Sequence, residues 1–158
     1  NAIEGAQAQL SRVYFDPAKY GTITASSCAA NGVVDAVKDG RRPASSADTT
    51  LDAWISSGDS EKEWIQMVFD QPQAIERLGL FWVSCDQVEI PADWRMEYLL
   101  DGNWHPFEKY ITDVYGVSKD RFNTIHPAAE LMCEGLRINI DAQAGKSVGL
   151  FDLELNLR

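Results

Sequence analysis

Apolar and polar residues alternate with a period of two along separate segments of this chain. The pattern is clearest in residues 94–100, 136–141 and 151–157, where large apolar side chains take one face and mostly charged or amide side chains the other. A half-buried β-strand requires this period, because successive side chains point to opposite faces of a sheet. Residues 64–69 and 75–83 are also β-prone, and sustained helical periodicity is nearly absent. The chain is therefore predicted to be all-β, a sandwich or barrel of antiparallel strands.

The same alternating pattern predicts where the chain turns and which side chains lie in the core. Residues 70–72 (Asp-Gln-Pro) predict a turn after the segment 64–69, and Asp101-Gly102 predicts a tight hairpin. In the last segment, Phe151 is expected to share the core face with Leu153 and Leu155. Among the tryptophans, we interpret Trp64, Trp82 and Trp94 as core residues because they lie in strand patterns, and Trp104 as a packing residue.

Length and charge limit the classes of protein. The 158 residues fit one domain with its own core, and 24 acidic against 14 basic residues give a net charge of −10. This charge repels phosphate and anionic lipid, which argues against nucleic acid as a partner and against membrane insertion. We expect residues 1–23 to form a lead-in and residues 24–158 the sandwich domain, in a chain whose start at Asn1 indicates an excised or processed fragment.

The three cysteines, Cys28, Cys85 and Cys133, are widely spaced. An odd number at this spacing does not resemble a disulfide framework or a zinc site. The sequence is compatible with two states. In one, two cysteines form a disulfide and the third is a free thiol; in the other, all three are buried thiols.

Four segments are too long to be tight turns: residues 40–63, 84–93, 108–124 and 141–149. Loops on a rigid sandwich are where binding residues concentrate. The sequence has no nucleophile elbow, no phosphate-binding glycine loop and no paired histidine motif, so a stand-alone enzyme is the least favoured interpretation.

The order of several short motifs resembles the discoidin family, also called coagulation-factor type C domains, which includes the family 32 carbohydrate-binding modules. The motifs are AVKDG at 36–40, EWIQMVF at 63–69, IERLGLFW at 75–82, PADWRMEY at 91–98, DGNW at 101–104, GLRI at 135–138 and GLFDLEL at 149–155. They span roughly residues 24–158. The segment YGVSKDRFN at 115–123 is most similar to modules appended to bacterial glycoside hydrolases.

The resemblance implies an eight-stranded, galactose-binding-domain-like jelly-roll β-sandwich that binds glycans through loops at one end and does no chemistry. It implies a periplasmic, cell-surface or extracellular bacterial protein, with a glycan and other domains of the same parent chain as partners. Two alternatives are a structural module that packs against a catalytic domain, and a protein-adhesion domain.

The resemblance also implies a structural calcium ion. Asp39 and Asp152 match the side-chain ligands, Ser45 or Ser46 would supply a hydroxyl, and backbone oxygens near Ala36, Arg41 and Phe151 would complete the shell. Calcium prefers six to eight oxygen ligands of this kind. The alternative is a plain Asp-Gly turn with an ordinary surface Asp152, in which Arg41 and Arg42 supply the positive charge.

A sugar site usually combines an aromatic ring that faces the sugar with polar groups that fix its orientation. The candidate aromatic residues are Tyr110, Tyr115 and Trp54, and the candidate polar residues are Asp86, Arg121 and Lys146. The loop at 84–90 carries no aromatic residue, so a stacking ring is not expected there.

Overall fold

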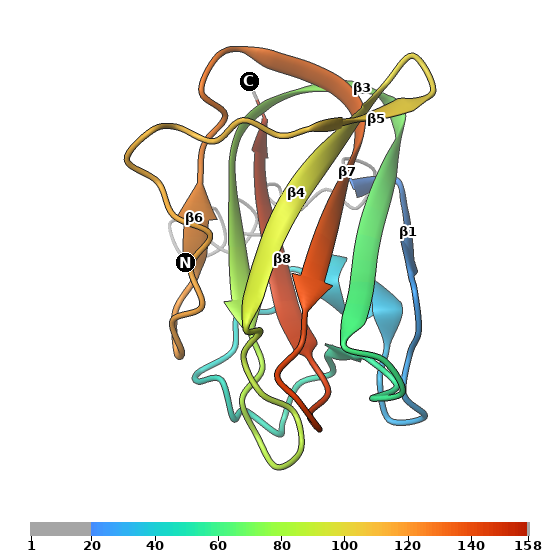
Figure 1. Ribbon diagram of the computed structural model, residues 1–158, viewed down its shortest axis with the longest axis vertical. Coiled ribbons are helices and arrows are strands. Elements are labelled where there is room, and N and C mark those ends of the chain that lie inside the picture. Colours follow the sequence, from blue (N-terminus) through green and yellow to red (C-terminus); the bar gives the residue numbers. More distant parts are fainter. Residues whose placement is uncertain (1–19, 158) are drawn as a thin grey trace, which may run out of the picture.

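The structure, a computed structural model, describes residues 20–157, so most of the expected lead-in lies outside the described residues. These residues form an antiparallel β-sandwich of eight strands, as the sequence predicts (Figure 1). The elements are β1 (Thr22–Ala25), η2 (Val34–Lys38), β2 (Trp54–Ile55), β3 (Lys62–Trp82), β4 (Asp93–Leu100), β5 (Asn103–Pro106), β6 (Asn123–Ile125), β7 (Leu131–Asp141) and β8 (Gly149–Leu157).

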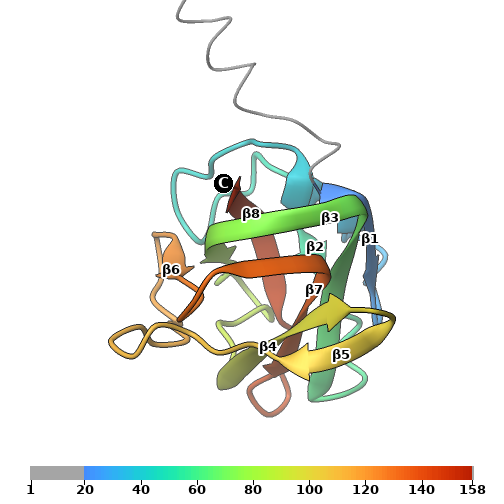
Figure 2. The same ribbon diagram turned by 90° about the horizontal axis from the view of Figure 1, so that it is seen from above.

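The long strand β3 belongs to both layers of the sandwich. Its first half pairs with β1 and β7, and its second half pairs with β8 and β6. The register with β7 shifts between Val68 and Gln73, where β3 and β7 arch together across the top of the molecule (Figure 2). The predicted turn at 70–72 is therefore wrong: the strand bends at an irregularity and does not reverse.

One layer, which we call the front sheet, has the order β1-β3-β7-β4-β5, and the other contains β2, β8, the second half of β3, and β6. The core lies between the two layers. It contains most of the apolar residues that the period-two pattern assigns to a buried face. Leu136, Ile138, Ile140, Trp82 and Trp94 are all at most 1% exposed.

The prediction that Phe151 shares a face with Leu153 and Leu155 is wrong. The pairing of β3 with β8 shifts register between Phe81 and Trp82, so Trp82 lies opposite Leu150. Leu153 and Leu155 stay in the main core, whereas Phe151 packs in a second apolar cluster beside Phe81. A bulge inserts one residue and so changes the face of the side chains before it.

The prediction that Trp64 is a core residue is also wrong. Trp64 is only partly buried, while Ile65 and Met67, on the opposite face of β3, are 2% and 1% exposed. The three cysteines are free thiols, with Cys28 exposed, Cys85 half-buried and Cys133 buried. No helix within residues 20–157 is long and apolar enough to cross a membrane.

Candidate functional site

Loops from both layers gather at the end of the sandwich opposite the arch of β3 and β7 (Figure 1). Hydrogen bonds join the β3–β4 loop to the β7–β8 loop: Ser147 donates its backbone N–H to Gln87 O at 3.0 Å, and Glu89 donates its own to Ser147 O at 2.9 Å. The Gln143 side chain adds a third bond, from Nε2 to Ile90 O at 2.9 Å. These bonds hold the two loops as one unit.

The segment between η2 and β2 is fastened beside this unit. Ser46 and Asp120 exchange two hydrogen bonds of 2.8 Å, from Ser46 N to Asp120 Oδ1 and from Asp120 N to Ser46 Oγ. Ser84 N donates to Ser46 O at 2.7 Å. Ser46, only 2% exposed, thus ties three loops together.

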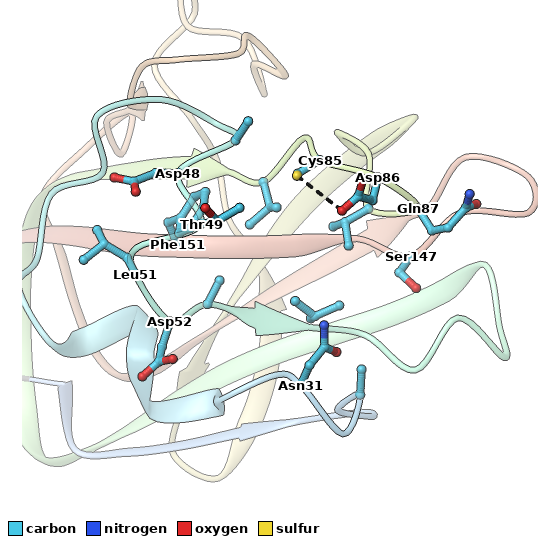
Figure 3. Close-up of a pocket in the computed structure, with 16 residues that line it drawn as sticks. Asn31, Asp48, Thr49, Leu51, Asp52, Cys85, Asp86, Gln87, Ser147 and Phe151 are labelled. Carbon is cyan, nitrogen blue, oxygen red and sulfur yellow. Dashed lines mark hydrogen bonds between the residues drawn. The ribbon is translucent and has the colours of Figure 1, made fainter.

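A cavity of about 460 Å³ opens between these segments, across the start of β8 (Figure 3). It is lined by residues of the segments 29–31, 47–55, 83–88, Ser147 and Phe151. Ligand sites for small molecules commonly have this size, with an apolar lining and a few polar groups.

The floor of the cavity is apolar and belongs to the second cluster of the core. Ala53, Val83 and Phe151 are each at most 5% exposed, and the partly buried Leu51 and Val88 pack against them. A floor of this kind fits the C–H surface of a ligand, because burying it removes apolar area from water.

The rim carries the groups that can hydrogen-bond. They are the carboxylates of Asp48, Asp52 and Asp86, the amides of Asn31 and Gln87, and the hydroxyls of Thr49 and Ser147 (Figure 3). Within residues 20–157, no lysine or arginine lines the cavity, so this part of the site is negative.

Local structure fixes two of these carboxylates. Hydrogen bonds from the backbone of Ala44 (2.9 Å) and Thr50 (3.0 Å) and from the Thr50 hydroxyl hold the pKa of Asp48 below its usual range, so Asp48 is ionised at neutral pH. Asp86 lies in a two-residue turn closed by Cys85 and Val88, with a left-handed φ of 55° that Asp tolerates better than most residues.

Of the six residues predicted to bind ligand, only Asp86 lines the cavity. Trp54 is fully buried and donates its indole N–H to Ser27 O at 2.8 Å, so its ring has no free face. Arg121 and Lys146 lie in neighbouring loops, outside the lining. The prediction missed Asn31, Asp48, Thr49, Asp52 and Ser147.

The two tyrosines lie on the 108–124 loop, outside the lining of the cavity. The Tyr115 ring packs against Trp94 with centroids 4.7 Å apart, and its hydroxyl lies 3.4 Å from Phe107 O, which it donates to. Burial raises the pKa of Tyr115. Tyr110, in contrast, is 51% exposed and stands beside exposed apolar residues of the same loop.

The two carboxylates that the resemblance implies as calcium ligands influence each other electrostatically. Helix η2 packs against β8 and ends at Lys38, with Asp39 as its C-cap residue, and the charge of Asp39 acts on Asp152. Asp152 is 5% exposed, and its pKa is raised to about 7, first by burial and then by the negative charge of Asp39. Arg42 offsets part of this effect, although its guanidinium pairs with Glu154 at 2.8 Å.

The remaining proposed ligands are neutral oxygens. The Ser45 hydroxyl accepts a hydrogen bond from Ala47 N at 3.2 Å, Ala36 and Phe151 are buried, and Arg41 N donates to Asp39 Oδ1 at 2.8 Å. Within the part of the chain that the structure describes, no three His, Cys, Asp or Glu side chains cluster around a metal position. Two carboxylates with neutral oxygens fit calcium and do not fit zinc.

The sequence matches the F5/8 type C domain family over residues 22–150, and the chain belongs to this family. No curated protein sequence matches the chain. Solved structures of similar fold include several that are distant in sequence.

Three similar structures illustrate this. One, from the β-galactosidase BgaA of Streptococcus pneumoniae, has a TM-score of 0.69 at 12% identity, covering 87% of this chain and 92% of the other. The family 32 carbohydrate-binding module of NanJ from Clostridium perfringens, solved with galactose, has a TM-score of 0.67 at 10% identity, covering 88% and 95%. Chitosan-binding module 1 from a chitosanase/glucanase of Paenibacillus sp. IK-5 has a TM-score of 0.66 at 18% identity, covering 89% and 97%. The chain therefore has the fold of these modules.

Proposed function

We propose that this domain is a noncatalytic carbohydrate-binding module, an accessory domain of a secreted bacterial glycoside hydrolase, and that the cavity at its loop end binds the sugar. The observation that carries the proposal is the cavity itself. Its apolar floor faces a rim of carboxylates, amides and hydroxyls at the loop-bearing end of a discoidin sandwich. This combination suits a ligand that is apolar on one face and rich in hydroxyl groups at its edges.

The rim also limits which sugars can bind. Carboxylates accept hydrogen bonds from sugar hydroxyls, while the Asn31 and Gln87 amides both donate and accept. Because the lining contributed by residues 20–157 has three carboxylates and no basic side chain, sugars with a carboxylate or sulfate group are repelled. Neutral sugars and amino sugars are the expected ligands, and galactose and chitotriose bind to two domains of this fold.

Calorimetric titration with galactose, N-acetylgalactosamine, glucosamine oligomers and galacturonic acid tests the proposal. We expect weak, micromolar-to-millimolar binding of neutral or amino sugars and none of galacturonic acid. Asp86→Asn and Gln87→Ala should weaken binding about tenfold each, because each removes a hydrogen bond to the ligand. Asp70→Asn, which changes an exposed carboxylate at the opposite end, is the matched control. No binding across a broad glycan panel at high protein concentration would overturn the proposal.

The same reasoning supports a calcium ion bound by Asp39 and Asp152. Burial and the nearby charge of Asp39 raise the pKa of Asp152 to about 7, so ionising Asp152 costs free energy in the metal-free protein. A bound divalent cation would offset this cost. The ion would join η2 to β8 and stabilise the fold, with no part in binding the sugar. We expect calcium to raise the melting temperature and a chelator to lower it, and no change in either direction would remove the ion.

A second candidate function is docking against another domain of the parent protein. Ile111 is 88% exposed, Val114 71% and Tyr110 51%, all on the 108–124 loop. Three large apolar side chains on one loop favour a protein contact over a sugar contact. Deleting the domain from the parent enzyme separates the functions: loss of activity on polymers alone indicates a binder, whereas loss of stability with simple substrates too indicates a scaffold.

A further inference from the structure

The outer face of the front sheet carries two tryptophans and a set of polar side chains, and no helix or strand within residues 20–157 packs over them. The strand registers place these side chains in rows across the sheet. One row contains Trp64, Asn139 and Arg95, and the next contains Gln66, Arg137 and Glu97. In the last row, Val68 and Leu99 flank Gly135, and Trp104 on β5 pairs with Leu99. We call this surface the sheet face.

Both tryptophans of the sheet face keep their indole N–H groups free. Trp64 and Trp104 are partly exposed, and neither indole N–H has a hydrogen-bond partner within residues 20–157. A partly exposed indole offers both an apolar ring and a donor, which are the groups that recognise a sugar face and its hydroxyl.

The polar side chains between the tryptophans are fixed by one another. Arg137 donates from Nε to Gln66 Oε1 at 3.2 Å and lies 3.6 Å from Glu97 Oε1. Asn139 donates to the same Glu97 oxygen at 2.7 Å. The Arg137 guanidinium also stacks on Trp104, 4.0 Å from the ring centroid. Side chains ordered in this way lose little entropy when a ligand binds.

Gly135 leaves the centre of the last row without a side chain. A Cβ atom at this position would lie 2.6 Å from Met67 O and 3.5 Å from the Leu99 Cβ. The backbone of β3 therefore fills the space beside Gly135, and the two strands approach each other closely there. No side chain stands between Val68 and Leu99 in this row.

The sheet face is electrically balanced, unlike the rest of the chain. It carries three basic residues (Lys62, Arg95 and Arg137) and three acidic residues (Asp93, Glu97 and Asp141). Lys62 and Arg95 both pair with Asp141, at 2.6 and 3.5 Å, and Arg137 lies 3.6 Å from Glu97. The chain as a whole has a net charge of −10. This balance favours a neutral partner rich in hydroxyl groups over a charged one.

We propose that the sheet face is a second glycan-binding surface, for a neutral, extended polysaccharide chain that contacts Trp64 and Trp104. From strand spacing and rise, the two residues are separated by about 20 Å along a diagonal of the sheet. That span requires an oligosaccharide, whereas the cavity at the loop end has room for one or two sugar units. The two surfaces together make the domain bivalent on a polymer, which raises its apparent affinity.

Binding and fluorescence of the whole 158-residue chain test this proposal, with soluble galactan, xylan, mannan and β-glucan as probes. We expect at least one polysaccharide to bind, to shift tryptophan emission and to protect it from acrylamide. Trp104→Ala should weaken that binding about tenfold, and Trp64→Phe, which keeps an aromatic ring and removes the donor, by a smaller factor. The cavity variant Asp86→Asn should keep the emission change. Tyr110→Ala is the matched control for an exposed aromatic residue outside both surfaces.

Two results would overturn the proposal. The first is that no probe protects tryptophan emission. The second is that Trp104→Ala and Trp64→Phe bind every polysaccharide as the wild type does, with melting temperatures showing that both are folded. If galactose or another small sugar still binds in the cavity in either case, the sheet face fails as a site while the carbohydrate-binding function stands.

Discussion

The five tryptophans fall into two groups that differ in how their indole N–H is used. The core tryptophans all donate to backbone carbonyls: Trp82 and Trp94 to Gly116 O at 3.1 and 2.8 Å, and Trp54 to Ser27 O at 2.8 Å. Trp64 and Trp104, on the sheet face, donate to no group within residues 20–157. Burial explains the difference, because an unpaired polar group away from water costs free energy.

The comparison separates side chains that build the fold from side chains that are available to a ligand. In the core, Trp82 and Trp94 tie the 108–124 loop to the sandwich through one carbonyl. On the sheet face, the indole N–H groups of Trp64 and Trp104 hold no loop against the sandwich within residues 20–157, so they can still donate a hydrogen bond to a ligand.

Removing a core tryptophan should cost most. Trp94→Ala deletes a fully buried ring that contacts Trp82 and Tyr115 and leaves Gly116 O with one donor fewer. We expect a loss of about 3–5 kcal/mol in the free energy of unfolding, the usual cost of truncating a buried Trp. Urea denaturation measures it, with Trp94→Phe as the milder control. A loss below ~1 kcal/mol would contradict the core role.

Asp152, like the core tryptophans, is a buried polar group. Unlike them, it carries a negative charge that nearby positive groups offset only in part. Its folded pKa of about 7 exceeds the ordinary value, so the protonated form stabilises the fold below pH ~4, and this stability is lost as the pH rises through 7. In chelator, Asp152→Asn should match the wild type near pH 3.5 and exceed it by up to ~4 kcal/mol at pH 8.

Calcium should reverse that order at pH 8. It should stabilise the wild type, whose carboxylate it holds ionised, and leave Asp152→Asn nearly unchanged. Melting curves at both pH values, with calcium or chelator, make the comparison. A wild type that is at least as stable as the variant at pH 8 in chelator would show that the chain itself balances this carboxylate.

Asn123 is a polar counterpart of the core tryptophans. It is 6% exposed, donates to Leu80 O (3.2 Å) and Ser118 O (3.0 Å), and accepts from Ser118 N (2.9 Å). Asn123→Ala leaves these backbone groups unpaired and should cost about 1–3 kcal/mol. Asn103→Ala, at an exposed position in the β4–β5 hairpin, is the control and should change the free energy of unfolding little.

The smallest effect on stability is expected at the sheet face. Trp104→Ala removes the stacking of Arg137 and a ring that is only partly buried, so the cost should be about 1 kcal/mol, well below that of Trp94→Ala. Thermal denaturation beside Trp94→Ala gives the direct contrast. Equal losses in the two variants would mean that Trp104 is a structural residue and would remove the basis for the division.

The strand pattern predicted the architecture because burial of one sheet face imposes a period of two. It placed Leu136, Ile138 and Ile140 correctly, and the order of motifs indicated the discoidin fold. It failed at Phe151, because a bulge shifts the period by one residue and leaves no mark in local composition. The pattern also failed at Trp64. Alternation divides the residues of a strand between two faces, but it does not show which of the two faces is buried in the core.

The site was harder to predict than the fold. The lining comes from segments that are far apart in the sequence, including those that carry Asn31, Asp48 and Ser147. The pairing of β8 with β2 and β3 brings these segments together. Polar residues in these loops resemble ordinary solvated residues. Asp86 was predicted because it lies in one of the long loops, where binding residues concentrate.

The central claim is that a neutral or amino sugar binds in the cavity at the loop end. Amide chemical shifts of the ¹⁵N-labelled protein, recorded while galactose or a glucosamine oligomer is added, test it most directly. We expect saturable shifts concentrated at residues 29–31, 47–55 and 83–88 and at Ser147, and none with galacturonic acid. Shifts that avoid these segments, or no shifts at millimolar concentrations across the glycan panel, would contradict it.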